Sequence, residues 1–485
     1  MQAANGSAAP DTAREEQALM DRIVRFITAA DYARIPEEMR VLAKHAVIDT
    51  VGVAVCGWRE PAVQIVKEVF AQPDAGSQQS SLWGEKSRLE SHQAAAVNGT
   101  ASHVLDFDDA TVGIPCHPSA PVLAAAIPLA EKLGSSGEEL ITAYAVGTEV
   151  LIQIGMAMGY HHYQLGWHAT DTLGTIGAAA ACARLLHLNE EQCANAIAIA
   201  ASMAGGLVKN FGTMTKSLHV GLAASHGIQA AELAGRGFTG NRDIFEARGF
   251  FHAFNAGGDE RQLRENLRRI RFGDPYDFLA NGRLSVKKFP CCYGAHRFIQ
   301  GALDLRREHG LTLENIKEIK LIAPPGGLLP LVHHRPQSGL EAKFCAEYLV
   351  LAAIADGYVK LGSFTDAMVR RPEIQRMLPQ VQAVETEGEA AGIQEQPDIV
   401  QIVTRSGQTL EITVRHPPGS AARPLSEQEY LEKWTDCLKN FAAGSPDGGA
   451  ADVERAAEEL YEKGMKLESY ARFGDWLNEM KERLM

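Results

Sequence analysis

Three aspartates are crowded into one short segment, and a histidine follows them. Asp106, Asp108 and Asp109 end an alanine-rich stretch, and His117 comes after a short loop broken by glycine and proline. Neighbouring carboxylates repel one another, and each costs free energy to desolvate when it is buried. Placing an imidazole beside such a cluster is one way in which proteins assemble proton-transfer groups. The segment is therefore either a proton-transfer site or a solvated acidic loop, since Asp is also common at helix ends and in turns.

Lysines that can face these carboxylates occur in two later segments. Lys216 precedes a helix that we expect to begin near Leu218, so its ammonium either projects from a loop into a cleft or is solvated at the surface. Lys287 belongs to a segment that also holds Cys292 and Tyr293. Lysine ammonium groups bind carboxylates, and a tyrosine hydroxyl can donate a proton. The adjacent cysteines of this segment are more typical of buried thiols than of nucleophiles.

Metal and nucleotide motifs are missing from the sequence. His168 lies in a loop just before a helical pattern, where by itself it is more typical of a structural residue. The eight cysteines are scattered, without CxxC or a paired spacing for zinc or an iron–sulfur cluster. No glycine-rich segment has the pattern of dinucleotide or P-loop binding. We therefore expect neither a metal nor another cofactor.

Composition limits the class of protein. With 485 residues the chain exceeds what one core usually supports, so two domains are expected. The formal net charge of −13 disfavours nucleic acid and anionic membranes as partners, although local cations still permit an anionic small substrate. We found neither a signal segment nor a run of about 18 apolar residues that would span a membrane. We expect a cytoplasmic protein.

Hydrophobic periodicity predicts a mostly α fold, with a large all-helical domain and a smaller α+β domain inserted before the C-terminal helices. Glycine and alanine are dense in the helical part, which lets helices approach closely. The expected domains are residues 12–275 (helical), 276–420 (α+β) and 421–485 (helices that return to the first domain). The main expected helices outside the core are Thr12–Ala33, His296–His309, Leu340–Gly357, Ser426–Ala442 and Val453–Leu484, and the main expected strands are Ile316–Ile322, Ile399–Thr404 and Thr409–Val414.

Four segments together resemble the MmgE/PrpD family, which includes 2-methylcitrate dehydratases, cis-aconitate decarboxylases and an iminodisuccinate epimerase. The segments are LDFDD followed by HPS (Leu105–Ser119), GWHAT (Gly166–Thr170), GTMTKSLHVGLAASHG (Gly212–Gly227) and KKFPCCYGAHR (Lys287–Arg297). They occur in the family's order and span most of the chain. The resemblance implies a helical domain with a smaller α+β lid, a site between the two, and a homodimer.

The resemblance also implies site residues. The positions that match site residues of the decarboxylase branch are Asp106, His117, His168, Lys216 and Lys287. Three positions depart from that branch: Cys292 replaces a histidine, the threonine after DFDD is displaced to Thr111, and Val332 stands near the place of the lid tyrosine. These departures argue against cis-aconitate decarboxylation.

The reactions of the family all handle a carbon next to a carboxylate, which requires an acid, a base and cations. We expect a cofactor-independent lyase that acts on a small di- or tricarboxylate, with 2-methylcitrate dehydratase, a common activity of the family, as the first choice. A cis-aconitate decarboxylase and an epimerase of an iminodisuccinate-like diacid are the alternatives. A non-catalytic helical scaffold dimer is the alternative of a different class.

The expected roles follow from the chemistry of each side chain. His117 and Asp106 form the acid/base pair, while Lys216 and His168 bind carboxylates and stabilise developing charge. The remaining expected contacts to the substrate come from Lys287, Thr111, Cys292 and Tyr293.

Overall fold

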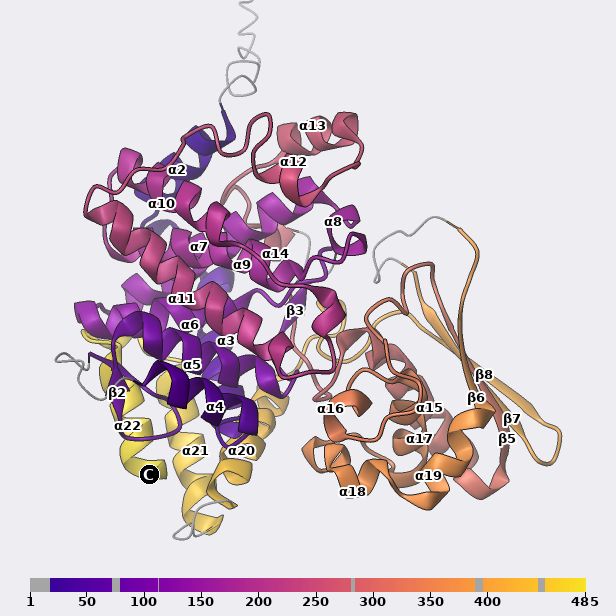
Figure 1. Ribbon diagram of the computed structural model, residues 1–485. Helices are drawn as coiled ribbons and strands as arrows, with labels where there is room; N and C mark the ends of the chain where they lie inside the picture. The colour runs from indigo at the N-terminus through magenta and orange to yellow at the C-terminus, as the bar shows by residue number, and fades with distance from the viewer. Residues whose placement is uncertain (1–17, 72–78, 112, 281–283, 389–395, 444–449) are drawn as a thin grey trace, which may run out of the picture.

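The computed structural model describes residues 18–71, 79–111, 113–280, 284–388, 396–443 and 450–485. A large helical domain lies beside a smaller domain that contains a four-stranded sheet (Figure 1). The chain forms most of the helical domain first and the smaller domain next, and its C-terminal helices then return to the helical domain. This arrangement confirms the predicted fold class.

Long helices form the core of the helical domain. They are α5 (Ser91–Val104), α6 (Ser119–Leu133), α7 (Gly137–Met158), α9 (Ala169–Leu185), α10 (Glu190–Met203) and α11 (Thr215–Gly235). Glycines lie where these helices cross closely. A Cβ atom added at Gly147 of α7 would lie 2.6 Å from the carbonyl oxygen of Gly177 in α9, and one added at Gly221 of α11 would lie 2.2 Å from that of Ala96 in α5. The small residues thus permit close helix packing, as predicted.

Helix α7 is a mostly buried helix of this core. By length and composition it passes the test for a membrane span, as do α3 (Glu37–Cys56) and α4 (Pro61–Phe70) together across a bend of 95°. However, 94% of the apolar window of α7 is buried inside the protein. Glu149 in this helix accepts hydrogen bonds from the backbone N–H groups of Gly273 and Asp277. This apolar stretch therefore packs as a core helix.

The smaller domain is built on a sheet with the strand order β6-β5-β7-β8. Its strands are β5 (Ile316–Ala323), β6 (Val381–Glu385), β7 (Asp398–Thr404) and β8 (Thr409–Val414). Strand β7 pairs antiparallel with β5 and β8, whereas β6 runs parallel to β5. Helix α15 (His296–His309) covers the sheet, and its Gly301 lies against Val400. Three of these strands were predicted, and the short β6 was missed.

The predicted helix Leu340–Gly357 is divided into two helices, α16 (Gly339–Ala342) and α17 (Ala346–Asp356).

The C-terminal helices close one side of the helical domain. They are α20 (Glu427–Ala443), α21 (Ala450–Gly464) and α22 (Gly474–Leu484). Helix α20 packs along α3, where the Lys433 ammonium lies 2.7 Å from the Asp49 carboxylate and Gly52 makes room for the Trp434 ring. The single helix expected over Val453–Leu484 is therefore wrong, because the chain leaves the helical path after Gly464.

Short elements complete the fold. The helices are α2 (Leu19–Ala29), α8 (His161–Gln164), α12 (Phe250–Phe254), α13 (Glu260–Arg269), α14 (Asp277–Ala280), α18 (Asp366–Val369) and α19 (Pro372–Met377), and the strands are β1 (Ser80–Ser81), β2 (Arg88–Leu89), β3 (Ala110–Thr111) and β4 (Leu284–Ser285). The part of the expected first helix before residue 18 lies outside the described residues. Strand β3 pairs antiparallel with β4, which joins the aspartate segment to the beginning of the segment that carries Lys287.

We expect Gly221→Ala to destabilise the protein. The added methyl group would meet the Ala96 carbonyl oxygen and the Thr100 hydroxyl at 2.2 and 2.5 Å. Helices α5 and α11 would have to separate, at a cost of about 1–3 kcal/mol. The control is Gly235→Ala on the same helix, where the nearest atom, in the flexible Leu188 side chain, is 3.3 Å away. Equal thermal midpoints for Gly221→Ala and the wild type in calorimetry would contradict this packing.

Candidate active site

The backbone turn Leu105–Phe107, directly after α5, is the centre of the site. Its three consecutive carbonyl oxygens each accept a hydrogen bond from a buried lysine. Lys343 donates to the carbonyl of residue 105, Lys287 to that of residue 106 at 2.9 Å, and Lys433 to that of residue 107 at 2.8 Å. Asp106 has a φ of 52°, in the left-handed region, which is uncommon for residues other than glycine. Two of the lysines come from the lid and one from α20, so three parts of the chain fix this turn.

Two ammonium groups hold the carboxylate of Asp106. Its Oδ1 atom lies 2.5 Å from Nζ of Lys216 and 3.2 Å from Nζ of Lys287. Burial opposes ionisation of this carboxyl, but the two ammonium groups outweigh burial and lower its pKa well below the usual range. Asp106 is therefore ionised at neutral pH, and its charge is balanced by one cation from α11 and one from the lid.

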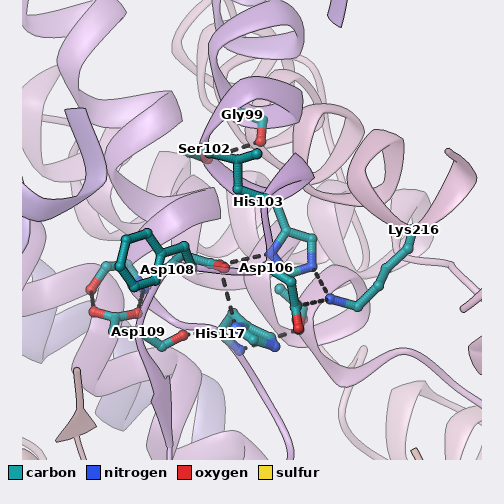
Figure 2. Close-up of polar contacts among 12 residues, drawn as sticks. Gly99, Ser102, His103, Asp106, Asp108, Asp109, His117 and Lys216 are labelled. Atoms are coloured by element: carbon teal, nitrogen blue, oxygen red, sulfur yellow. Dashed lines mark hydrogen bonds and ion pairs between the residues drawn. The ribbon is translucent and has the colours of Figure 1, made fainter. Parts of the chain in front are cut away.

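Asp108 lies between two imidazoles (Figure 2). Its Oδ2 atom is 2.7 Å from Nδ1 of His103 and 3.3 Å from Nδ1 of His117. Nδ1 of His117 is also 2.7 Å from the carbonyl oxygen of Asp109. Both neighbours of this nitrogen are acceptors, so Nδ1 of His117 carries a hydrogen and Nε2 is the position that can gain or lose a proton. Burial lowers the pKa of His117 although Asp108 opposes the shift, so the neutral imidazole dominates at pH 7.

Asp109 has a different environment from the other two aspartates. Its carboxyl interacts with the hydroxyl and the backbone N–H of Ser119, whose hydroxyl is 2.8 Å from that of Tyr144. Burial raises the pKa of Asp109 to about 7, since no cation compensates the loss of water around it among its described contacts. This carboxyl therefore anchors α6 and does not face the imidazoles of the site.

His168 offers an unused ring nitrogen. Its Nδ1 atom lies 3.0 Å from Nδ1 of His219, whereas its buried Nε2 atom has no hydrogen-bond partner among the described residues. Burial and then the Lys216 ammonium lower the pKa of His168 well below its usual value, so the ring is neutral. A buried nitrogen without a partner is costly, which indicates that a bound group supplies the partner.

These groups surround a small cavity of about 60 Å³. Seven of the eight predicted site residues line it: Asp106, Thr111, His117, His168, Lys216, Cys292 and Tyr293. Lys287 does not line it, because its ammonium is turned toward the backbone and carboxylate of Asp106. A second cavity of about 600 Å³ adjoins the first and shares Asp106, Lys216 and Phe344 with it.

Cys292 and Tyr293 contribute to the lid side of the small cavity. Burial raises the pKa of the Cys292 thiol to about 11, so it stays protonated at neutral pH. The Thr111 hydroxyl, which was expected to contact substrate, donates to the carbonyl oxygens of its own loop at Ile114 and Cys116. Lys216 lies in the first turn of α11 and not in a loop before it, since the helix begins at Thr215.

Asp108 was noted in the aspartate cluster without a role of its own, and three further residues of the site had no predicted role. His103 lies three residues before Asp106, within the last turn of α5, so proximity to the aspartates was a signal that could have found it. Lys343 and Lys433 carry no such signal, because only the folding of the lid and of α20 brings them to the turn.

Four groups also have the arrangement of metal ligands. Ligand atoms of His103, Asp106, Asp108 and His117 all lie within 4.8 Å of one another. However, the ammonium groups of Lys216 and Lys287 already contact Asp106, and a divalent cation would be repelled by both. The residues therefore fit two ammonium groups better than a metal ion.

Comparison with known proteins identifies the family of this chain. The MmgE/PrpD N-terminal domain matches residues 21–263, and the MmgE/PrpD C-terminal domain matches residues 289–459. Cis-aconitate decarboxylase of Homo sapiens is 30% identical over 403 residues, 81% of this chain and 82% of the relative. The protein of the same name from Mus musculus is 30% identical over 81% of each chain, and that from Aspergillus terreus is 25% identical over 82% and 85%. The chain therefore belongs to the MmgE/PrpD family, as its motifs predicted, and is a lyase or isomerase of that type.

Proposed function

We propose that the protein is a lyase that decarboxylates cis-aconitate or a tricarboxylate of the same shape. The observation that carries the proposal is the cavity that the Lys216 ammonium, the unpartnered Nε2 of His168 and the imidazole of His117 line together. The names of the relatives favour decarboxylation over the dehydration of 2-methylcitrate that was the first expectation. No described contact favours dehydration specifically.

The chemistry needs cations and one proton. Loss of CO2 from the carboxylate on the saturated carbon of cis-aconitate leaves an electron pair. This pair forms a new double bond, and the original double bond shifts its electrons to the carbon next to a remaining carboxylate. A proton added there completes the product, which has one C–H bond more and one carboxylate fewer. The site must therefore hold two carboxylates, stabilise an enolate-like charge and deliver a proton.

The geometry supports a division of these tasks. Lys216 and His168 bind the retained carboxylates and stabilise the developing charge. The Lys216 ammonium donates at the cavity, and Nε2 of His168 donates there in the tautomer in which Nδ1 accepts from His219. His117 first takes up a solvent proton at Nε2, and this imidazolium, which Asp108 stabilises through Nδ1, then delivers the proton to the substrate carbon. The low pKa of Asp106 disfavours the acid/base role expected for it and favours a role as the anchor of two lysines. With both ammonium groups in place, no metal is needed for charge balance.

Substrate entry requires movement of the lid in this proposal. A cavity of about 60 Å³ is much smaller than the roughly 300–1,000 Å³ typical of small-molecule sites. The larger adjoining cavity of about 600 Å³ shares Lys216 and Asp106 with it, so separation of lid and helical domain would join the two. Closure then removes water from the reacting groups, which strengthens their electrostatic interactions.

Proton NMR of the purified protein with separate polycarboxylates tests the proposed reaction. We expect cis-aconitate to be converted to itaconate, with the solvent proton appearing in the new methylene group. Water loss from 2-methylcitrate with inert cis-aconitate would replace the proposal by dehydration. Hydrogen exchange in iminodisuccinate without net conversion would indicate an epimerase, and no change with any of the three acids would contradict all these activities.

Lys216→Met is expected to lower kcat by about 10²–10³, because one preorganised donor to the developing charge is lost. The matched control is Lys288→Met, whose side chain is 44% exposed and pairs with Glu429 at the surface. We expect the control to keep the kcat and thermal midpoint of the wild type. Near-normal kcat in Lys216→Met would remove this lysine from the mechanism.

Asp108→Asn is expected to move the pH profile of kcat/KM toward acid. If His117 is the acid, activity falls as the pH rises through its pKa, which burial places below the ordinary value of 6.5. Removing the carboxylate that favours the imidazolium lowers this pKa further, by about one unit or more. Asp109→Asn is the control. The pKa of Asp109 is about 7, but its carboxyl binds Ser119 and not His117, so this substitution should leave the pKa of His117 in place. If Asp108→Asn left the pH profile of kcat/KM unchanged, the role of His117 as the acid would be contradicted.

A further inference from the structure

His103 is a buried histidine to which the proposed reaction assigns no role. It lies in the last turn of α5, is 1% exposed, and uses both ring nitrogens. Its Nε2 atom is 2.8 Å from Nζ of Lys216, and its Nδ1 atom is 2.7 Å from Oδ2 of Asp108 (Figure 2). The chain thus places a neutral ring between the cation that faces the cavity and the carboxylate that contacts His117.

The partners of His103 determine where its proton lies. A lysine ammonium only donates hydrogen bonds, so the Nε2 atom that faces Lys216 must be the acceptor. A neutral imidazole with an accepting Nε2 carries its hydrogen on Nδ1, from which it donates to Asp108. Protonation of Nε2 would place two donors 2.8 Å apart. Burial also lowers the pKa of His103 to about 3, so the ring stays neutral near pH 7.

This arrangement fixes the direction of the Lys216 ammonium. One of its three N–H groups is directed to Nε2 of His103 and a second to Oδ1 of Asp106. The rings of Phe211 and Phe344 each lie 5.3 Å from Nζ and limit its movement. The third N–H group is left for the cavity that Lys216 lines. Without the acceptor on His103, the ammonium would be held by Asp106 alone and could turn toward that carboxylate.

We infer that His103 is a positioning residue that accepts a hydrogen bond from Lys216, in the tautomer fixed by Asp108, and thereby aims one N–H of Lys216 at the carboxylate of the substrate. The inference rests on the proposed function for what Lys216 binds, but not for the tautomer or the contact. Asp108 serves both imidazoles through one oxygen atom, so it fixes the tautomer of His103 and stabilises the charge on His117 together. The groups that face His103 are Asp106, Asp108, His117, His168 and Lys216.

The tautomer is tested without any substrate. In full-length protein labelled with 15N at histidine, long-range proton–nitrogen correlation spectra distinguish the two neutral tautomers and the imidazolium. We expect one ring with Nδ1–H and a bare Nε2 that does not titrate between about pH 5 and 8, unlike an ordinary histidine. Its signals should be missing from His103→Gln. A His103 ring with Nε2–H, or one that gains charge in this range, would overturn the inference even if the proposed reaction is correct.

Two substitutions test by kinetics the contact of His103 with Lys216 separately from its contact with Asp108. In His103→Gln the amide oxygen can still accept from Lys216, whereas in His103→Asn the shorter amide reaches only toward Asp108. We expect His103→Asn to lower kcat about 10²-fold, since a misplacement of about 1 Å can cost that much, and to change KM less. His103→Gln should retain more of the wild-type kcat. Equal losses in both variants, or none in His103→Asn, would overturn the inference.

Two controls distinguish positioning from stability. His45 is 7% exposed, and its ring nitrogens lie 3.0 Å from Glu427 and 3.4 Å from Tyr461, outside both cavities. We expect His45→Gln to lower the thermal midpoint without lowering kcat. In a double-mutant cycle, His103→Asn should cost little further in a Lys216→Met background, because the residue it positions is already absent. Additive losses would contradict the coupling, whereas inactivity of the wild type toward every acid would refute only the proposed function.

Discussion

Charge compensation of the buried aspartates is the constraint on which the rest of the structure depends. Asp106 and Asp108 are almost completely buried, and buried carboxylates without partners cost several kcal/mol each. The partners come from distant parts of the chain: Lys216 from α11 and Lys287 from the lid. Removing one partner from a buried pair typically costs about 3–5 kcal/mol, so the contact of Lys287 with Asp106 favours the closed position of the lid.

The same contacts explain why the site lies where it does. The turn Leu105–Phe107 presents three carbonyl oxygens as hydrogen-bond acceptors, and the lysines that bind them belong to the lid and to α20. Close packing of α5 on α11 through Gly99 and Gly221 then brings His103 to Lys216. A site built in this way combines cations with neutral imidazoles among buried side chains, where charge stabilisation is stronger than in water. Opening of the lid would break the contacts of Lys287 and Lys343 with the turn, whereas those of Lys216 and Lys433 lie within the helical domain.

The sequence predicted what depends on local pattern. Helices and three strands followed from periodicity, and the aspartate segment drew attention to Asp106 and His117. Residue pairs such as His103 and Lys216, which are 113 positions apart, were not predictable because only the packed helices bring them together. For the same reason Lys287 was expected at the substrate but lies against Asp106. The homodimer and the cytoplasmic location stay predictions, since no described contact bears on them.

A crystal structure of the protein with a bound tricarboxylate tests the account most directly. We predict that one carboxylate of the ligand accepts from Nζ of Lys216 and from Nε2 of His168, with Nε2 of His117 facing the carbon that gains the proton. The turn at Asp106 should keep its left-handed conformation and its three lysine contacts. A ligand bound in the larger cavity, with the three nitrogens unengaged, would contradict the account.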